Sequence, residues 1–293
     1  MSSGSVENDV AVLGCGNMGS AFVRAALASG HRVAVWNRSA VRARALVVDG
    51  VQVMESAEDA VRSAPIAILC VGTSADAREV LESVGLAAFA GVTVLNVTSG
   101  GPEDSVAIGR WADARGVSYL DGAILAYPKQ IGTQEACILV AGSDELWQAH
   151  ASLVYDLAGS SLHVGPDYGA ASVIDASFTG GFFISSVVAF IEATRHMTAF
   201  GASTRVIESL LGYASSQLEG EMRDVLQRVE GGEFATDQAS LKVYQEASQG
   251  WLASMCTRDA APMLTAAVAT LCRGVDEGLG EEDIAALVKL RTL

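Results

Sequence analysis

Residues 10–19 read VAVLGCGNMG, and this stretch decides the fold of the first half of the chain. Four apolar residues predict a buried strand, and the G-x-G-x-x-G pattern after them predicts a tight turn into a helix. Gly14 allows the turn, Gly16 lets a pyrophosphate approach the backbone, and Gly19 lets helix and strand pack closely. Unpaired N–H groups and the helix dipole would then attract the phosphates. The predicted phosphate-loop residues are Gly14, Gly16, Asn17, Met18 and Gly19.

Short β-like runs alternate with helical stretches over the first 160 or so residues. The expected strands are 10–13, 31–36, 66–71, 92–97, 117–120 and 136–141, and the helices expected between them are 19–29, 40–48, 75–81 and 102–115. This alternation predicts an α/β fold, a doubly wound parallel sheet of the Rossmann type with right-handed crossovers. We therefore expect residues 1–165 to form a dinucleotide-binding domain.

Strand signals end near residue 160, and the remainder is typical of helices. The expected helices are 168–197, 205–220, 221–229, 236–251, 260–274 and 281–291, with caps at Thr236 and Gly280. The first would be about 45 Å long. Its middle carries few charges, so we expect burial nearly all round, against a second domain or a second copy. We assign 166–197 as an interdomain helix and 198–293 as a helical domain for dimerisation and substrate binding.

The residues after the second expected strand indicate which dinucleotide binds. NAD-binding proteins place a carboxylate there to hold the ribose 2′-hydroxyl. Residues 36–39 read WNRS, with no carboxylate, and the guanidinium of Arg38 matches the geometry of a phosphate. We therefore predict a preference for NADPH, and the alternative is a solvated arginine at a helix start. The predicted contacts are Asn37, Arg38, Ser39 and Arg42.

Two later strand ends should flank the nicotinamide, because ligands of open α/β sheets bind outside the carboxyl ends of the strands. The loops concerned follow the strands at 66–71 and 92–97. A purely structural role for Thr98 or Ser99, as a cap of the next helix, is an equal alternative. The predicted contacts are Val71, Gly72, Thr73, Asn96, Thr98 and Ser99.

Composition excludes several classes of protein. The 293 residues are 50% hydrophobic and 18% charged, which is incompatible with a disordered chain. The net charge of −15 and the lack of a cationic run argue against a nucleic-acid partner. An odd count of five cysteines without a C-x-x-C pair, and four scattered histidines, predict a reducing, cytoplasmic location and no metal site.

Targeting and membrane signals are weak in this sequence. The polar, acidic start at residues 1–9 does not read as a signal peptide. The low-charge run 176–191 is shorter than the roughly 18–20 residues that span a bilayer. We therefore expect no membrane partner.

Residues 14–19, the WNRS tetrad at 36–39 with Arg42, and residues 91–101 resemble the β-hydroxyacid dehydrogenase superfamily. The resemblance implies a Rossmann domain joined by a long helix to a helical domain. Hydroxy-acid dehydrogenases of that superfamily carry a catalytic lysine on this helix and a D-A-P-V-S-G-G-like loop. This chain has no lysine in the helix, and its loop at 121–133 reads DGAILAYPKQIGT.

The pattern at 165–171 followed by Asp175, together with the P-x-x-I-G-T loop, resembles the imine reductases, in which Asp or Tyr replaces that lysine. The resemblance implies NADPH-dependent reduction of a C=N bond to an amine, with a cyclic imine as a typical substrate. It also implies a domain-swapped homodimer whose helical halves interleave. The alternatives are a hydroxy-acid dehydrogenase of the same fold and a non-catalytic NADPH-binding module.

Asp175 is the candidate catalytic residue. A carboxylate attracts the iminium that a lysine would repel. It could donate a proton to a neutral imine if burial raises its pKa, or orient a preformed iminium as an anion. The structural alternative is a buried helix aspartate paired with a backbone group or an arginine. The candidate substrate contacts are Ser99, Tyr127, Phe178, Phe182, Phe183, Tyr244 and Trp251.

Overall fold

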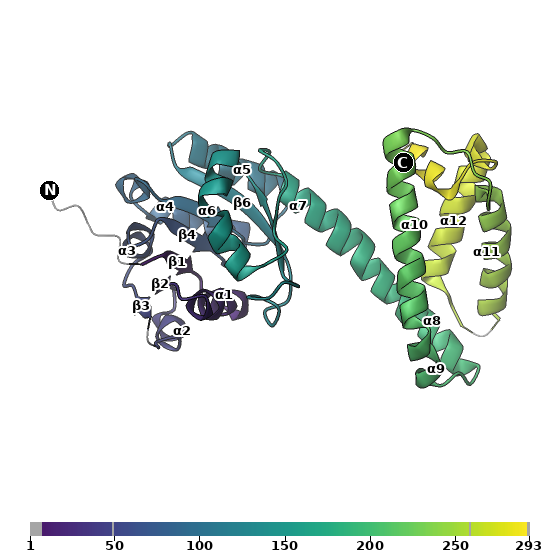
Figure 1. Cartoon of the computed structure of the whole chain (residues 1–293), viewed down its shortest axis with the longest axis horizontal. Helices are drawn as coiled ribbons and strands as arrows, with labels where there is room; N and C mark the ends of the chain where they lie inside the picture. The colour runs from purple at the N-terminus through teal and green to yellow at the C-terminus, as the bar shows by residue number, and fades with distance from the viewer. Residues whose placement is uncertain (1–7, 49, 258, 292–293) are drawn as a thin grey trace. The chain divides into compact units, whose positions relative to one another are not determined.

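One sheet organises the first part of the chain in the computed structural model, which describes residues 8–48, 50–257 and 259–291 (Figure 1). Within this described part the strand order is β3-β2-β1-β4-β5-β6-β7-β8. Neighbouring strands from β3 to β6 are parallel, β7 runs antiparallel to β6, and β8 is parallel to β7. The strands are β1 (Val10–Leu13), β2 (Val33–Trp36), β3 (Val51–Val53), β4 (Ile66–Leu69), β5 (Thr93–Asn96), β6 (Ser118–Leu125), β7 (Cys137–Ala141) and β8 (Leu162–His163).

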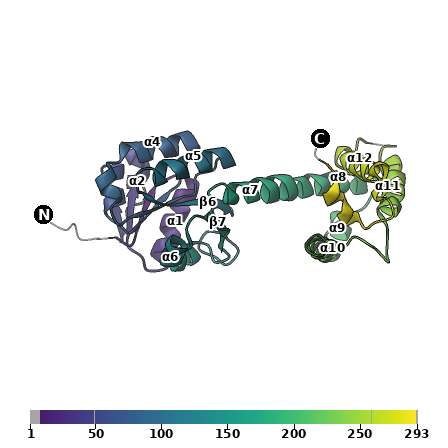
Figure 2. The same cartoon turned by 90° about the horizontal axis from the view of Figure 1, so that it is seen from above.

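Helices cover both faces of this sheet, as the doubly wound prediction requires (Figures 1 and 2). On one face, α1, α2 and α6 pack on apolar side chains such as Val12 and Ile68. On the other, α3, α4 and α5 pack on Leu13 and Leu69. The helices are α1 (Asn17–Ala28), α2 (Ala40–Arg44), α3 (Ala57–Arg62), α4 (Ser74–Ser83), η1 (Leu86–Phe89), α5 (Pro102–Asp113) and α6 (Asp144–Leu157).

The predicted strands all exist, with ends shifted by a few residues. The sequence analysis missed β3 and β8, because runs of three and two residues are too short to show a period. It also missed α3 and α6. The expectation about residues 1–9 concerns mainly residues 1–7, which lie outside the described residues.

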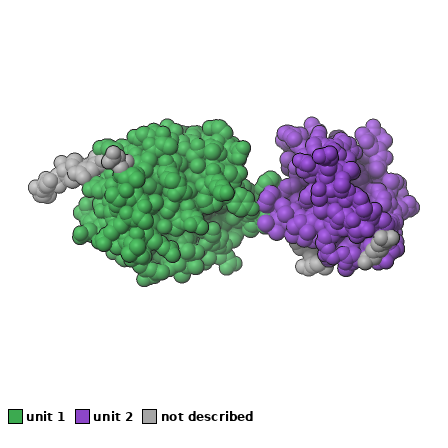
Figure 3. All heavy atoms as spheres, turned by 90° about the horizontal axis from the view of Figure 1, so that it is seen from below, with its two compact units in different colours: residues 1–181 green, residues 182–293 purple. Residues whose placement is uncertain are grey.

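Two compact units divide the chain between Gly181 and Phe182 (Figure 3). In its described residues the second unit contains helices and no strand, as predicted. Its helices are α8 (Ser185–Ala199), α9 (Thr204–Ser209), α10 (Leu211–Gly231), α11 (Leu241–Met255), α12 (Pro262–Gly274), η3 (Val275–Leu279) and η4 (Ile284–Lys289).

Three expectations for this unit were wrong. A single helix, α10, runs through the predicted break after Gly220, because one interior glycine costs a helix only about 1 kcal/mol. Helix α11 begins after Ser240 rather than at Thr236. The last segment is a 3₁₀ helix capped by the side chain of Asp283, which accepts from the N–H of Ala285, so Gly280 is not its cap.

The expected long helix is helical throughout Ala170–Ala199 but not uniform. It comprises α7 (Ala170–Ile174), a wider π-helical stretch η2 (Asp175–Ile184), and α8. Its most apolar window has a mean hydropathy of 1.6, so by length and composition alone it could cross a membrane, as core helices of water-soluble proteins also could. No residue of η2 or α8 is buried in the single chain, so the burial expected against a second copy stays a prediction.

Candidate active site

The glycine loop between β1 and α1 has the shape that its sequence predicts. Gly14 has a φ of +110°, and a Cβ atom there would lie 2.0 Å from the carbonyl oxygen of Cys70. A Cβ on Gly19 would lie 1.8 Å from the carbonyl oxygen of Gly14. At Gly16, by contrast, a Cβ would meet nothing within 4 Å among the described atoms. The loop is therefore closed on its protein side and open on the side where a phosphate would approach.

The N-terminus of α1 points its free N–H groups into this opening. Gly16 is the N-cap residue and has no side chain to occupy those groups, and the first turn carries no acidic residue. The N–H of Cys15 is already paired, because it donates to the side-chain oxygen of Asn37 over 2.9 Å. The N–H groups of the first helical turn, with the positive end of the helix dipole, are suited to bind an anion.

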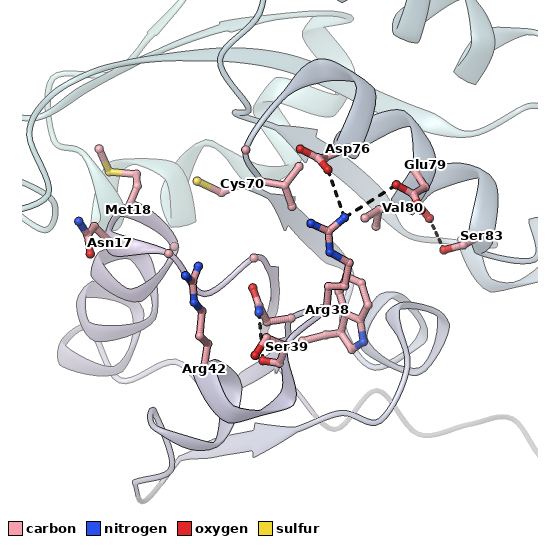
Figure 4. Close-up of a pocket in the computed structure, with 17 residues that line it drawn as sticks. Asn17, Met18, Arg38, Ser39, Arg42, Cys70, Asp76, Glu79, Val80 and Ser83 are labelled. Atoms are coloured by element: carbon pink, nitrogen blue, oxygen red, sulfur yellow. Dashed lines mark hydrogen bonds and ion pairs between the residues drawn. The ribbon is translucent and has the colours of Figure 1, made fainter.

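A pocket of about 790 Å³ opens at the carboxyl ends of β1, β2 and β4, next to this loop (Figure 4). It contains eleven of the predicted cofactor contacts, from Gly14 to Gly72. Thr73, Asn96, Thr98 and Ser99 are outside its lining. The lining residues are Gly14, Gly16, Asn17, Met18, Gly19, Trp36, Asn37, Arg38, Ser39, Arg42, Cys70, Val71, Gly72, Asp76, Glu79, Val80 and Ser83.

The polar residues after β2 divide into two groups. Asn37 uses both ends of its amide within the protein, since its oxygen accepts from the loop and its nitrogen donates to the backbone oxygen of Ser39 over 3.0 Å. Arg38 and Arg42 supply the positive charge of the pocket. The side chain of Arg38 is 79% exposed, so it is accessible to a ligand. Asn37 shapes the pocket, whereas the arginines offer charge to a phosphate.

Six lining residues were not among the predicted contacts, and two of them carry charge. Trp36 ends β2 and Cys70 directly follows β4, whereas Asp76, Glu79, Val80 and Ser83 belong to α4. Asp76 and Glu79 are three residues apart and therefore share one face of the helix. That spacing, directly after a strand end at the ligand edge, is the signal that could have revealed them.

Several of the cofactor contacts predicted after β4 and β5 instead connect the ends of these strands by hydrogen bonds. The hydroxyl of Thr98 accepts from the N–H of Val71 over 3.2 Å, and the Asn96 side chain accepts from the N–H of Thr98 over 3.1 Å. Both side chains are buried. Thr73 caps α4, and Ser99 is exposed. Of this group, Thr73 and Ser99 are thus the exposed side chains, and Thr73 already serves as a helix cap.

A buried polar cluster links these strand ends to α7. The Asn96 amide donates to the hydroxyl of Tyr119 over 3.0 Å, and that hydroxyl donates to Asp121 over 3.3 Å. Beside them, the hydroxyls of Ser105 and Ser172 lie 2.8 Å apart, both buried. Burial raises the pKa of Asp121 to about 7, although the nearby hydroxyls of Ser105 and Tyr119 oppose the shift.

Asp175 lies one turn after Ser172 on the helix that this cluster anchors. Helix α7 packs on α5, β6 and β7, with Ala171 fully buried against Ala123 and Leu139. Asp175 itself is half-buried and starts the π-helical stretch. Local π-helical geometry is rare and recurs at functional sites. Asp175 does not line the pocket; it is carried by a helix fixed to the same unit.

The candidate substrate contacts fall into two sets. In the first unit, Tyr127 is 65% exposed and Phe178 is 54% exposed. Tyr127 lines a second hollow of about 600 Å³, together with Ser20, Arg24 and Lys129 among others. In the second unit, Trp251 is 61% exposed and burial raises the pKa of Tyr244, which is half-buried. Phe182 and Phe183 begin that unit.

The described residues at the pocket give little support for a nucleophilic cysteine or a metal ion. Burial raises the pKa of both Cys15 and Cys70 to about 11, so neither thiol is a ready nucleophile at neutral pH. Among the described residues no group of three or more His, Cys, Asp or Glu side chains is arranged to hold a metal ion.

Fold and pocket together define a dinucleotide-binding α/β protein, and a comparison with known families gives the same class. Residues 9–165 match the model for the NAD binding domain of 6-phosphogluconate dehydrogenase. The chain belongs to this family.

Relatives that match over nearly the whole length of the chain indicate a narrower class of protein. An NADPH-dependent reductive aminase of Aspergillus oryzae is 25% identical over 287 residues, which cover 96% of each protein. An imine reductase structure from Pseudomonas sp. has a TM-score of 0.87 with 29% identity, covering 97% of this chain and 99% of that one. An imine reductase from Myxococcus stipitatus in complex with NADP⁺ has a TM-score of 0.85 with 29% identity, covering 96% and 99%.

Proposed function

We propose that this protein is an NADPH-dependent imine reductase that reduces a C=N bond to an amine. The proposal rests on one combination of features. The first unit has an open phosphate loop and two pocket arginines, and it carries Asp175 on a helix that contains no lysine. Similarity over nearly the whole length to imine reductases and a reductive aminase supports the same activity. NADPH supplies the hydride when it is bound.

The pocket residues fit that cofactor. The open space at Gly16 suits a pyrophosphate at the N-terminus of α1, and the guanidinium of Arg38 suits a 2′-phosphate. We assign residues 1–165 to NADPH binding and 198–293 to dimerisation and substrate binding, with 166–197 as the connecting helix. The nicotinamide side of the site would use the outward-facing Ser99.

Asp175 would act on the nitrogen of the substrate. Protonated imines are better electrophiles, and a carboxylate stabilises the positive charge that a lysine would oppose. Asp175 either donates the proton or holds a preformed iminium. The aromatic candidates Phe178, Phe182, Phe183, Tyr244 and Trp251 would then shape the apolar part of the substrate site.

We also propose a domain-swapped homodimer. The segments η2, α8 and α10 contain no buried residue in the single chain, and apolar side chains such as Ile191 and Leu226 are 53% and 68% exposed. Such an exposed apolar surface in a water-soluble protein indicates a partner surface. A second copy is preferred to a membrane because the exposed apolar side chains of α10 lie on a helix that also carries exposed charges such as Glu219 and Arg223. A monomeric mass in solution would contradict the homodimer.

A cytoplasmic location completes the proposal. All five cysteines are free in the structure, in agreement with a reducing compartment. Fractionation of cells should recover the protein with the soluble fraction rather than with membranes.

The deciding experiment follows NADPH oxidation by absorbance with a small cyclic imine, 2-methyl-1-pyrroline. Turnover supports imine reduction. Oxidation of 2-hydroxy acids with NADP⁺ would instead support the dehydrogenase alternative, and NADPH binding without turnover of any imine would support a non-catalytic module. Asp175→Asn should lower kcat/KM by about 10²-fold or more. Asp167→Asn, the same change at an exposed residue of the same unit, is the matched control.

A permanently charged substrate separates the two roles of Asp175. The N-methylated ion 1,2-dimethyl-1-pyrrolinium needs no proton before reduction. If Asp175 is a proton donor, Asp175→Asn should reduce this ion at a near-normal rate while losing activity on the neutral imine. If Asp175 is an electrostatic anchor, both substrates should be impaired. Normal kcat/KM on both substrates in folded Asp175→Ala would refute either role.

A further inference from the structure

Two carboxylates on α4 face the arginine that would hold the 2′-phosphate. The Nη1 atom of Arg38 lies 3.3 Å from Asp76 Oδ1 and 4.0 Å from Glu79 Oε2 (Figure 4). All three side chains line the same pocket. The guanidinium is therefore paired with protein carboxylates at the place where a phosphate would compete for it.

The two carboxylates differ in how firmly they are held. Asp76 receives a hydrogen bond from the hydroxyl of Thr73 over 2.8 Å, and its own N–H donates to that hydroxyl. Its side chain is 32% exposed, whereas the side chain of Glu79 is 75% exposed. Asp76 is thus a hydrogen-bonded partner of Arg38, and Glu79 is an exposed one that lines the pocket.

The charges of the pocket cancel. Its charged lining residues are Arg38 and Arg42 on one side and Asp76 and Glu79 on the other. A pocket that prefers a phosphorylated cofactor gains from excess positive charge, because a 2′-phosphate adds about two negative charges. Both α4 carboxylates would repel that phosphate, and both compete with it for Arg38. An exposed ion pair is weak, so its loss removes little preorganisation of the arginine.

We propose that Asp76 and Glu79 are selectivity residues that limit the preference of this pocket for NADPH over NADH. They hold Arg38 when no 2′-phosphate is present, and their charge weakens binding when it is present. The inference deepens the proposed function, since it assumes that the pocket takes a nicotinamide dinucleotide. It does not depend on which substrate is reduced.

Glu79→Gln is the first test, because this exposed side chain can lose its charge without a packing change. The dissociation constants of NADPH and NADH are measured by the fluorescence of the reduced nicotinamide with the whole protein and no substrate. We expect the Kd of NADPH to fall three- to tenfold and that of NADH to change less than twofold. The gain should shrink at 500 mM NaCl, where the screening length is only about 4 Å.

Glu82→Gln is the matched control. Glu82 lies on the same helix, pairs with Arg78 over 2.8 Å and does not line the pocket. It should leave both dissociation constants within twofold of the wild type. Asp76→Asn should also lower the Kd of NADPH, and the double variant should lower it more than either single substitution.

Several outcomes would overturn the proposal. An unchanged or weaker affinity for NADPH in Glu79→Gln would mean that the carboxylates orient Arg38 rather than compete for it. An equal gain for NADH would mean a general charge effect. Tight NADPH binding that responds as expected, with no turnover of imines, would overturn the proposed reaction and leave this inference standing. Failure of the wild type to bind NADPH would overturn both.

Discussion

Replacing Asp121 by asparagine tests how the buried acid affects stability. Its side chain is 2% exposed, and its Oδ2 atom is buried without a hydrogen-bond partner among the described residues. Burial raises the pKa to about 7 in the folded protein, from the ordinary value of 3.8 that applies when the chain is unfolded. Asparagine has nearly the same shape and carries no charge at any pH, so it removes the titration and keeps the side-chain volume.

The magnitude follows from the two pKa values. A difference between about 7 and 3.8 is equivalent to about 4 kcal/mol, at 1.36 kcal/mol per unit. The folded state binds the proton more tightly, so this contribution to stability is fully present below pH 4 and is lost as the pH rises to 7. Between pH 5 and pH 8 the wild type should lose about 3 kcal/mol through this residue, and Asp121→Asn should not.

Urea unfolding followed by circular dichroism, at pH 5 and pH 8 and one protein concentration, measures this difference. Other titrating groups, such as His150, whose pKa is lowered by burial, contribute equally to both proteins and cancel. Asp167→Asn, the exposed control, should follow the wild type at both pH values. If the free-energy difference between the wild type and Asp121→Asn changed by less than about 1 kcal/mol from pH 5 to pH 8, the reasoning from burial would be refuted.

Four further substitutions test the pocket and the second unit. Gly19→Ala should weaken NADPH binding at least tenfold and lower the Tm, because its Cβ meets the carbonyl of Gly14; Gly16→Ala, which meets nothing within 4 Å, should weaken binding at an unchanged Tm. Asn37→Ala should weaken the binding of NADPH and of NADH equally in the same fluorescence titration, because it removes hydrogen bonds that hold the loop and not a contact to the 2′-phosphate. A loss of affinity for NADPH alone would contradict this. Glu192→Gln should destabilise the second unit by about 1 kcal/mol, since the carboxylate accepts two N–H groups at the start of α12. Faster hydrogen exchange confined to α12 would confirm this destabilisation, and unchanged exchange would contradict it.

The parts of the fold that the sequence predicts are those with a strong local signal. Strands β1 and β4 are continuous apolar runs, which a parallel sheet covered on both faces requires. The strand β3 (Val51–Val53) is too short for that signal, and Gly220 looks like a break although one interior glycine costs a helix only about 1 kcal/mol.

The pocket could be predicted where backbone geometry restricts residue type. Only glycine fits at positions 14 and 19, so this turn can be predicted from the sequence alone. Asp76 and Glu79 were missed because two acids on a helix ordinarily indicate a solvated face. Their role depends on the facing strand end, and a distance between α4 and Arg38 is a tertiary property that no local pattern contains.

The hydrogen bonds of Asn37 bear on how cofactor use could be redesigned. Asn37 of the WNRS tetrad is bonded within the scaffold, and its neighbour Arg38 is the residue that we propose to contact the 2′-phosphate. Because these tasks belong to separate side chains, a library aimed at NADH should keep Asn37, Asp76 and Glu79 constant and vary Arg38 and Arg42. Diversity placed at Asn37 would mostly yield unstable members, so a small library of this design should be richer in active proteins than a larger one spread over the whole tetrad.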